Sequence, residues 1–273
     1  NYRFGVMNEH KKNNPNAEKE YRQAIEKNPK HIKAAWRLAR LTASKNDPAG
    51  AIEILEKLTD GPHSLAIKTF LAYCYNQLGD FERSRALYLE VAEQDHQAGL
   101  KSYREVDEVP ERFLAASELG ALDVTLGNFE EAKRYLEMAL EVNDKDFVAR
   151  NSYAQALRRL GLTEQASAEL ARLERERVEF DKITILRDKV NQNPNDTEAK
   201  IAIGKILFEY ESERFGLFWI RSALATDPNC QAAHEFLADY YESKVDENEL
   251  FRSKAAYHRS RVVQSQPQSA DAH

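Results

Sequence analysis

Short apolar segments with helical spacing recur along the whole chain. In each of them a small residue stands beside an aliphatic or aromatic one, and each is followed by a second apolar segment of the same kind. The pattern predicts pairs of helices whose small residues permit close approach of the two axes. The first segments contain Leu38-Ala39, Leu71-Ala72, Leu119-Gly120, Tyr153-Ala154, Ile203-Gly204 and Leu237-Ala238.

The helix pairs repeat with a period of about 34 residues, which is typical of helical repeat proteins. The sequence numbers of the first-helix positions just listed differ by 33, 48, 34, 50 and 34. Small residues in the second helices differ in number by 34, 33, 48, 34 and 50, at Ala17, Ala51, Ser84, Ala132, Ala166 and Gly216. Two independent markers therefore predict the same register, interrupted by insertions of about 14 and about 16 residues.

The turn between the two helices of a pair also has a recurring sequence. Gly79, Gly127 and Gly161 each follow a leucine at the end of a first helix, where glycine adopts a positive φ more easily than other residues. The chain resembles the tetratricopeptide repeat family on these features. The copy that carries the resemblance best contains Leu119, Gly120, Leu126, Gly127, Phe129, Ala132, Leu136 and Ala139.

The resemblance implies an all-α, right-handed α-solenoid of about seven helix–turn–helix repeats with two helical insertions. The second insertion has no Gly or Pro before Pro194, so it is interpreted as one long helix or two abutting ones. The predicted organisation is amino-terminal repeats at 1–94 with the first incomplete, an insertion at 95–110, central repeats at 111–174, a helical extension at 175–194, carboxy-terminal repeats at 195–261 and a disordered polar tail at 262–273.

Composition excludes several classes of protein. Of the 273 residues, 42% are apolar and 31% are charged, with no apolar run long enough to cross a membrane. The net charge of −6 disfavours nucleic-acid binding, and two cysteines far apart in the sequence, Cys74 and Cys230, cannot form a disulfide framework. The chain opens at Asn1 and its end repeats are irregular, which favours a portion of something larger and leaves the compartment unassigned.

Catalytic and metal-binding patterns are missing from the sequence. No two of the seven histidines are three or four residues apart, and there is no Cys-x-x-Cys pair, phosphate loop or nucleophile elbow. His234 lies near Glu235 and Asp239, but is interpreted as a packed or surface histidine. We therefore expect no enzyme activity, no metal and no cofactor.

The resemblance implies that the first helix of each pair lines a concave groove. Basic residues gather at its amino-terminal side and acidic ones at its carboxy-terminal side, so the sequence suggests a peptide whose acidic end lies near Lys33 and Arg40. The alternative is that these charges are ordinary solvent-facing residues. The predicted groove residues are Lys33, Trp36, Arg37, Arg40, Thr69, Tyr73, Asn76, Ser117, Asn151, Gln155, Arg158, Lys205, Glu235 and Asp239.

The prediction for function is a non-catalytic scaffold or adaptor that binds a protein or peptide partner. The clamp by which chaperone co-factors of this family bind a carboxy-terminal carboxylate is not reproduced, because its Lys and Asn places are Trp36 and Arg40 in the second repeat. Two alternatives remain open. The chain could be the accessory part of a larger enzyme, electron-transfer or secretion protein, or a structural module that self-associates through the long insertion or an exposed edge repeat. Neither a nucleic-acid partner nor membrane insertion is predicted.

Overall fold

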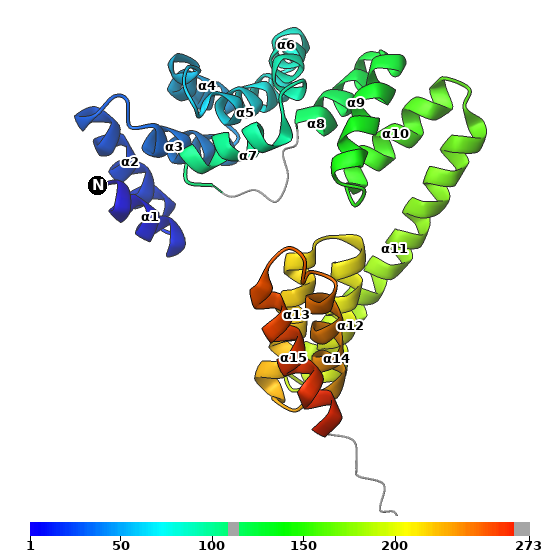
Figure 1. The fold of residues 1–273 in the computed structure, drawn as a ribbon. Helices are drawn as coiled ribbons and strands as arrows, with labels where there is room; N and C mark the ends of the chain where they lie inside the picture. Colours follow the sequence, from blue (N-terminus) through cyan, green and yellow to red (C-terminus); the bar gives the residue numbers. More distant parts are fainter. Residues whose placement is uncertain (109–114, 265–273) are drawn as a thin grey trace, which may run out of the picture. The chain divides into compact units, whose positions relative to one another are not determined.

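The computed structural model describes residues 1–108 and 115–264, and these residues form helices joined by short turns (Figure 1). The chain divides into two compact units, Asn1–Leu170 and Ala171–His273. The end of the predicted disordered tail, residues 265–273, and residues 109–114 lie outside the described residues. The helices of the first unit are α1 (Tyr2–His10), α2 (Asn14–Lys27), α3 (Ile32–Ser44), α4 (Pro48–Leu55), α5 (Ser64–Gln77), α6 (Phe81–Ala92), α7 (His96–Glu105), α8 (Ala115–Leu126), α9 (Phe129–Val142) and α10 (Phe147–Arg159).

The remaining helices lie at the end of the chain. They are α11 (Thr163–Gln192), which begins in the first unit, and then α12 (Thr197–Tyr210), α13 (Glu213–Thr226), α14 (Gln231–Glu242) and α15 (Glu249–Gln264). Consecutive helices pack as the pairs α1/α2, α3/α4, α5/α6, α8/α9, α12/α13 and α14/α15, while α10 is followed by α11. This is the all-α arrangement of helix–turn–helix repeats that the sequence predicts.

The small residues of the repeat lie where two helices of a pair touch. Ala72 and Ala132 are fully buried, and the hydroxyl of Ser84 donates a hydrogen bond of 2.8 Å to the carbonyl oxygen of Ala72. A Cβ atom on Gly120 would lie 2.4 Å from Cγ of Leu136, which is closer than two carbon atoms can approach. These contacts explain why the repeat keeps small side chains at fixed intervals.

The turn glycines adopt the predicted backbone conformation. The φ angles of Gly79, Gly127 and Gly161 are +76°, +83° and +77°. This left-handed conformation ends the first helix of a pair, and it carries little steric cost for glycine.

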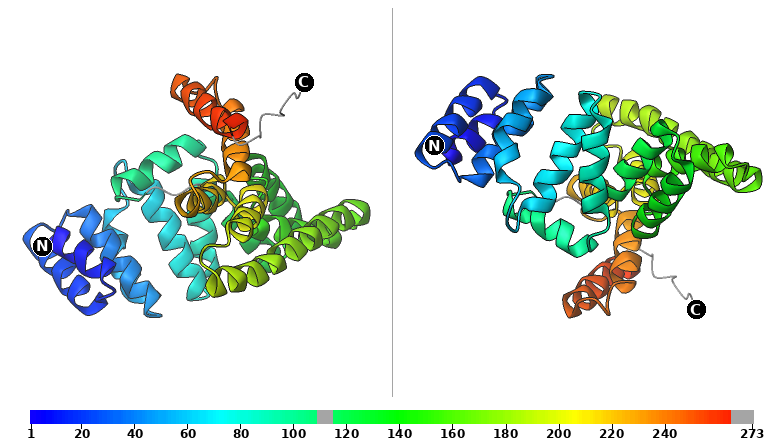
Figure 2. Two further views of the ribbon diagram at one scale, coloured as in Figure 1. Left: turned by 90° about the horizontal axis from the view of Figure 1, so that it is seen from below. Right: turned by 90° about the horizontal axis from the view of Figure 1, so that it is seen from above.

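The two insertions differ in form. The first adds the short helix α7, capped by the side chain of Asp95, and it packs on α5. The second belongs to α11, a single unbroken helix of 30 residues that is about 45 Å long at 1.5 Å per residue (Figures 1 and 2). Of the two forms considered for the second insertion, the structure has one continuous helix.

The second unit has its own apolar core. The carboxy-terminal half of α11 packs on α12 through Ile183, Ile203 and Leu207. The helices α14 and α15 are joined by a hydrogen bond of 2.8 Å between the Nδ1 atoms of His234 and His258. Because Nε2 of His234 lies 3.0 Å from the carbonyl oxygen of Pro228, it carries the proton, and Nδ1 of His234 accepts from His258. His234 is therefore a packed histidine, as the sequence suggests.

Acid should destabilise the packing of α14 on α15. Burial, together with the neighbouring His234 and Arg221, lowers the pKa of His258 to about 4, below its ordinary value of 6.5. The unfolded chain then binds a proton more readily than the folded one, so stability falls as the pH drops from about 6.5 towards 4. Thermal unfolding followed by circular dichroism at pH 7.5 and 5.0 should show a lower midpoint in acid. The difference should shrink in His258→Gln and persist in the control His96→Gln, and an equal difference in both variants would contradict this account.

Candidate functional site

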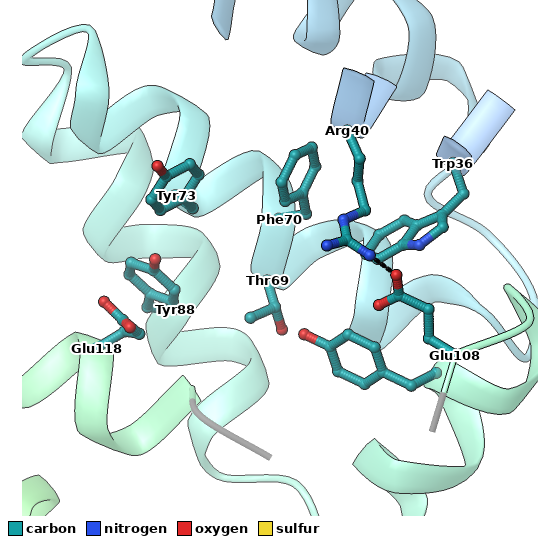
Figure 3. A pocket seen from close by; sticks show the side chains of 9 residues that line it. Trp36, Arg40, Thr69, Phe70, Tyr73, Tyr88, Glu108 and Glu118 are labelled. Carbon is teal, nitrogen blue, oxygen red and sulfur yellow. Dashed lines mark ion pairs between the residues drawn. The ribbon is translucent and has the colours of Figure 1, made fainter. Parts of the chain in front are cut away.

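One face of α3 carries the three basic residues that the sequence singles out. Lys33, Arg37 and Arg40 are spaced by four and three residues, which places them on one side of a helix. Trp36 lies between them on the same side and is 2% exposed. The neighbouring helix α5 presents Thr69, Phe70 and Tyr73 toward this face (Figure 3).

Each of these basic residues is paired with a carboxylate of the chain itself. The Nζ atom of Lys33 lies 3.2 Å from Oδ1 of Asp107, and Nη1 of Arg37 lies 3.4 Å from Oε2 of Glu9. Arg40 forms an ion pair with Glu108, drawn as a dashed line in Figure 3. Carboxylates therefore do lie at Lys33 and Arg40, and they come from the end of the first insertion. We call residues 103–108 the acidic segment.

The titration of the acidic segment reflects these contacts. The hydroxyl of Tyr2 donates a 2.8 Å hydrogen bond to Asp107, and this bond together with that from Lys33 lowers the pKa of the Asp107 carboxyl. Burial and the neighbouring Arg37 lower the pKa of the Arg40 guanidinium. The first shift reflects the pairing of Asp107 with Tyr2 and Lys33, and the second reflects the burial of Arg40 beside another cation.

Apolar contacts and a hydrogen bond hold the insertion against the same helices. Val106 is fully buried in the cluster that contains Trp36, and the ring of Tyr103 meets that of Trp36 edge-on at a centroid distance of 5.9 Å. The backbone N–H of Ala66 donates to the hydroxyl of Ser102 at 2.9 Å. Asp107 then turns the chain with a φ of +66°, the left-handed region, which a non-glycine residue adopts at a cost.

An aromatic pocket of about 240 Å³ lies beside the acidic segment (Figure 3). Phe70 and Tyr73 are stacked at 5.9 Å, and Phe70 also contacts Trp36 at 5.3 Å. Glu118 of α8 is the carboxylate on the far side from Glu108. The pocket is lined by Trp36, Arg40, Thr69, Phe70, Tyr73, Tyr88, Tyr103, Glu108 and Glu118.

Two residues that line this pocket each have a polar atom buried without a hydrogen-bond partner among the described residues. The two atoms are Nε1 of Trp36 and the hydroxyl oxygen of Tyr88. Burial, and to a lesser extent Glu118, raises the pKa of Tyr88 well above its ordinary value, so its hydroxyl stays protonated. Such unpartnered groups are rare in folded proteins, because each costs about 1–3 kcal/mol.

Models of the tetratricopeptide repeat match most of the first unit and the start of the second. One model matches residues 43–105, and another matches residues 12–64 and 118–178, so together they cover more than half of the sequence. The chain belongs to the tetratricopeptide repeat family. Repeats of this family are typically non-catalytic interaction modules, and the fold fits a protein-interaction scaffold.

Solved tetratricopeptide repeat structures resemble the chain at low sequence identity. The carboxy-terminal part of a TPR repeat-containing protein from Cytophaga hutchinsonii is 12% identical, with 99% of this chain and 97% of that chain covered and a TM-score of 0.50. MamA is 16% identical over 65% of this chain and 96% of that one, with a TM-score of 0.53. YrrB, a TPR protein with an unusual peptide-binding site, is 19% identical over 78% and 95%, with a TM-score of 0.46. A comparison with curated protein sequences gave no match.

The predicted groove residues of this tetratricopeptide repeat protein fall into two sets. In the first unit Asn76 is partly exposed, Asn151, Gln155 and Arg158 are exposed, and Thr69 and Ser117 are buried.

In the second unit Lys205 is exposed, Nε2 of Gln231 donates to Glu235 at 2.9 Å, and Nη2 of Arg259 lies 2.7 Å from Asp239. The acidic end of the predicted groove thus holds a basic residue of its own chain.

Several residues of the site were not among those predicted. Phe70 and Tyr88 belong to helices of the repeat, while Tyr103, Asp107 and Glu108 belong to the first insertion, in which the sequence predicts no groove residue. The signal was an apolar pair three residues apart, Tyr103 and Val106, followed at once by two carboxylates.

Other kinds of site find no support in the described part of the chain. No group of three or more His, Cys, Asp or Glu residues is arranged there to hold a metal ion. None of the helices described is both long and apolar enough to cross a bilayer.

Proposed function

We propose that the chain is a non-catalytic scaffold or adaptor that binds a protein partner on the α3–α5 face of its first unit. Acidic residues of the partner would pair with Lys33, Arg37 and Arg40. An extended peptide would then pass Tyr73 and Asn76 towards Asn151, Gln155 and Arg158, whose side chains can hydrogen-bond to a peptide backbone.

The observation that carries this proposal is the binding of the chain's own acidic segment. Lys33 and Arg40 each hold a carboxylate of residues 107–108, and Arg37 donates to the main-chain oxygen of Asp107 at 3.4 Å. The face is therefore complementary in charge and shape to one acidic stretch of chain, which supports its use for another.

The exposure of these ion pairs supports exchange of one acidic stretch for another. The side chains of Lys33 and Asp107 are 43% and 48% exposed. Ion pairs at such positions contribute roughly 0–1 kcal/mol each, so a partner that also places an apolar side chain here can compete with them.

Affinity capture from the native cell extract tests the proposal. Wild type is compared with a triple variant that carries Lys33→Glu, Arg37→Glu and Arg40→Glu. The retained proteins are identified by mass spectrometry. The triple variant should retain at least about tenfold less of an acidic partner, because each reversal turns attraction into repulsion. The control is Lys19→Glu, Lys57→Glu, Lys101→Glu, which makes the same change of charge at exposed positions. Equal retention by all three proteins would contradict the proposal.

A further inference from the structure

Three apolar side chains of α11 lie exposed at intervals of seven residues. They are Ala171, Val178 and Ile185, and the last two are 45% and 63% exposed. Seven residues are close to two helical turns, so the three side chains form one row along the helix, here called the apolar row. Leu173 and Ile183 are buried apolar residues of the same stretch, and they lie on the other side of the helix. The apolar row therefore does not serve the core of the second unit, to which this stretch belongs.

Charged side chains of opposite sign flank the apolar row. Three residues after each apolar residue stands an acidic one, and four residues after it stands a basic one. At about 100° per residue, the acidic position lies about 60° to one side of the apolar row and the basic position about 40° to the other. All six charged residues are exposed. The acidic row consists of Glu174, Asp181 and Asp188, and the basic row consists of Arg175, Lys182 and Lys189.

Ion pairs within α11 leave the two charged rows able to bind a second partner. Arg177 lies 2.6 Å from Glu174 and 3.3 Å from Asp181, on the side of the acidic row that faces away from the apolar row. Lys182 pairs with Glu179 at 2.6 Å, and Glu179 lies in the same way beyond the basic row. Arg177 and its two carboxylates are each more than half exposed, and ion pairs at such positions contribute little.

This arrangement of rows is complementary to itself in one orientation. If two copies of α11 pack in parallel about a twofold axis along the helices, the acidic row of each copy faces the basic row of the other. Because the acidic and basic positions are consecutive in sequence, each carboxylate then lies within about 1.5 Å, along the axis, of the level of a basic residue of the second copy. In an antiparallel pair, acidic rows would meet acidic rows and basic rows would meet basic rows. The charges therefore favour the parallel pair.

We propose that the chain forms a homodimer in which residues 171–189 of α11 pack in parallel on the same residues of a second copy. The apolar rows of the two copies are in contact, with Val178 and Ile185 each opposite their own counterparts. Branched side chains such as Val and Ile suit this position in parallel two-stranded helix pairs. The proposal concerns the second unit alone and does not depend on the function proposed for the first.

Sedimentation equilibrium of the full chain tests the proposal. The average mass of wild type should rise with protein concentration towards twice the mass of one chain. Reversal of the acidic row to lysine, or of the basic row to glutamate, should each weaken the dimer at least about tenfold, because rows of like charge then meet. An equimolar mixture of the two variants should dimerise again, since each row then faces the opposite charge. The matched control is Glu26→Lys, Glu53→Lys, Glu82→Lys, which changes exposed carboxylates of the first unit and should leave the dimer unaffected.

Oxidative cross-linking tests the parallel orientation. In a chain with Cys230→Ser, the variants Ala171→Cys and Ile185→Cys should each form a disulfide-linked dimer when oxidised alone, because each introduced thiol lies opposite its counterpart. An antiparallel pair centred on Val178 would instead cross-link only when the two variants are mixed. Four results would overturn the proposal: a monomer mass at every concentration, a dimer unaffected by reversal of either row, a mixture of the row variants that stays monomeric, or cross-linking confined to the mixture of cysteine variants.

Discussion

The double variant Asp107→Lys, Glu108→Lys should bind an acidic partner about 10–100-fold more tightly than the wild-type protein. In wild type the acidic segment is tethered to the face that it covers, so it competes at an effective concentration on the order of millimolar. The substitutions remove its attraction to Lys33 and Arg40 and leave these side chains available. The left-handed backbone at Asp107 already disfavours the bound conformation, which limits the cost of its release.

The measurement is quantitative capture of the same acidic partner by wild type and variant. Glu53→Lys, Glu82→Lys is the matched control, because both glutamates are exposed and lie outside the acidic segment. Asp107→Asn, Glu108→Gln removes the charge without reversing it, and should give a smaller gain in the same direction. Weaker capture by both acidic-segment variants, with unchanged thermal midpoints, would show that the segment helps the partner to bind rather than competing with it.

Gly216→Ala should lower the stability of the second unit by about 2 kcal/mol, because it overpacks a close contact between two helices. A Cβ atom at this position would lie 2.4 Å from Cβ of Phe208 and 2.6 Å from its Cα and backbone N. Because two of these atoms are backbone, α12 and α13 would have to separate, and overpacking of this kind costs about 1–3 kcal/mol or more. The higher helix propensity of alanine, about 1 kcal/mol, offsets only part of that cost.

Thermal unfolding followed by circular dichroism measures this effect. For a unit of this size, a loss of about 2 kcal/mol corresponds to a fall of about 10 °C in Tm. Ser222→Ala changes a partly exposed position of the same helix and should leave the Tm within about 2 °C. A Tm that is unchanged or higher in Gly216→Ala would show that the two helices can separate at little cost.

The repeat could be predicted from sequence because its determinants are local. Gly79, Gly127 and Gly161 are required by backbone conformation, and Gly120 by one close contact inside a helix pair. Each determinant lies within the same helix pair as its partner, so a pattern of spacings records it directly.

The surface of the repeats could not be predicted in the same way. The helical pattern places Lys33, Trp36 and Arg40 on one face, but whether that face is open depends on residues 103–108, which follow two repeats later in the chain. Tyr88 was missed because it belongs to a second helix, whereas the resemblance directs attention to first helices. Contacts of this kind follow from tertiary packing, and no spacing encodes them.

The continuity of α11 was also undecided at the level of sequence. A stretch without Gly or Pro allows one helix or two, because a break between helices needs no particular residue. In the structure α11 is one continuous helix from Thr163 to Gln192.

The most direct test of the central claim uses a free peptide that contains the chain's own acidic segment. Acetylated Lys-Ser-Tyr-Arg-Glu-Val-Asp-Glu, residues 101–108, is titrated by isothermal calorimetry into wild type and into Asp107→Lys, Glu108→Lys. If the α3–α5 face binds acidic stretches of chain and is covered by its own, the peptide should bind the variant at least about tenfold more tightly than wild type. Reversal of the charge at Lys33, Arg37 and Arg40 in the same variant should abolish that binding. Failure of the peptide to bind a folded variant, or equal binding to both proteins, would contradict the claim.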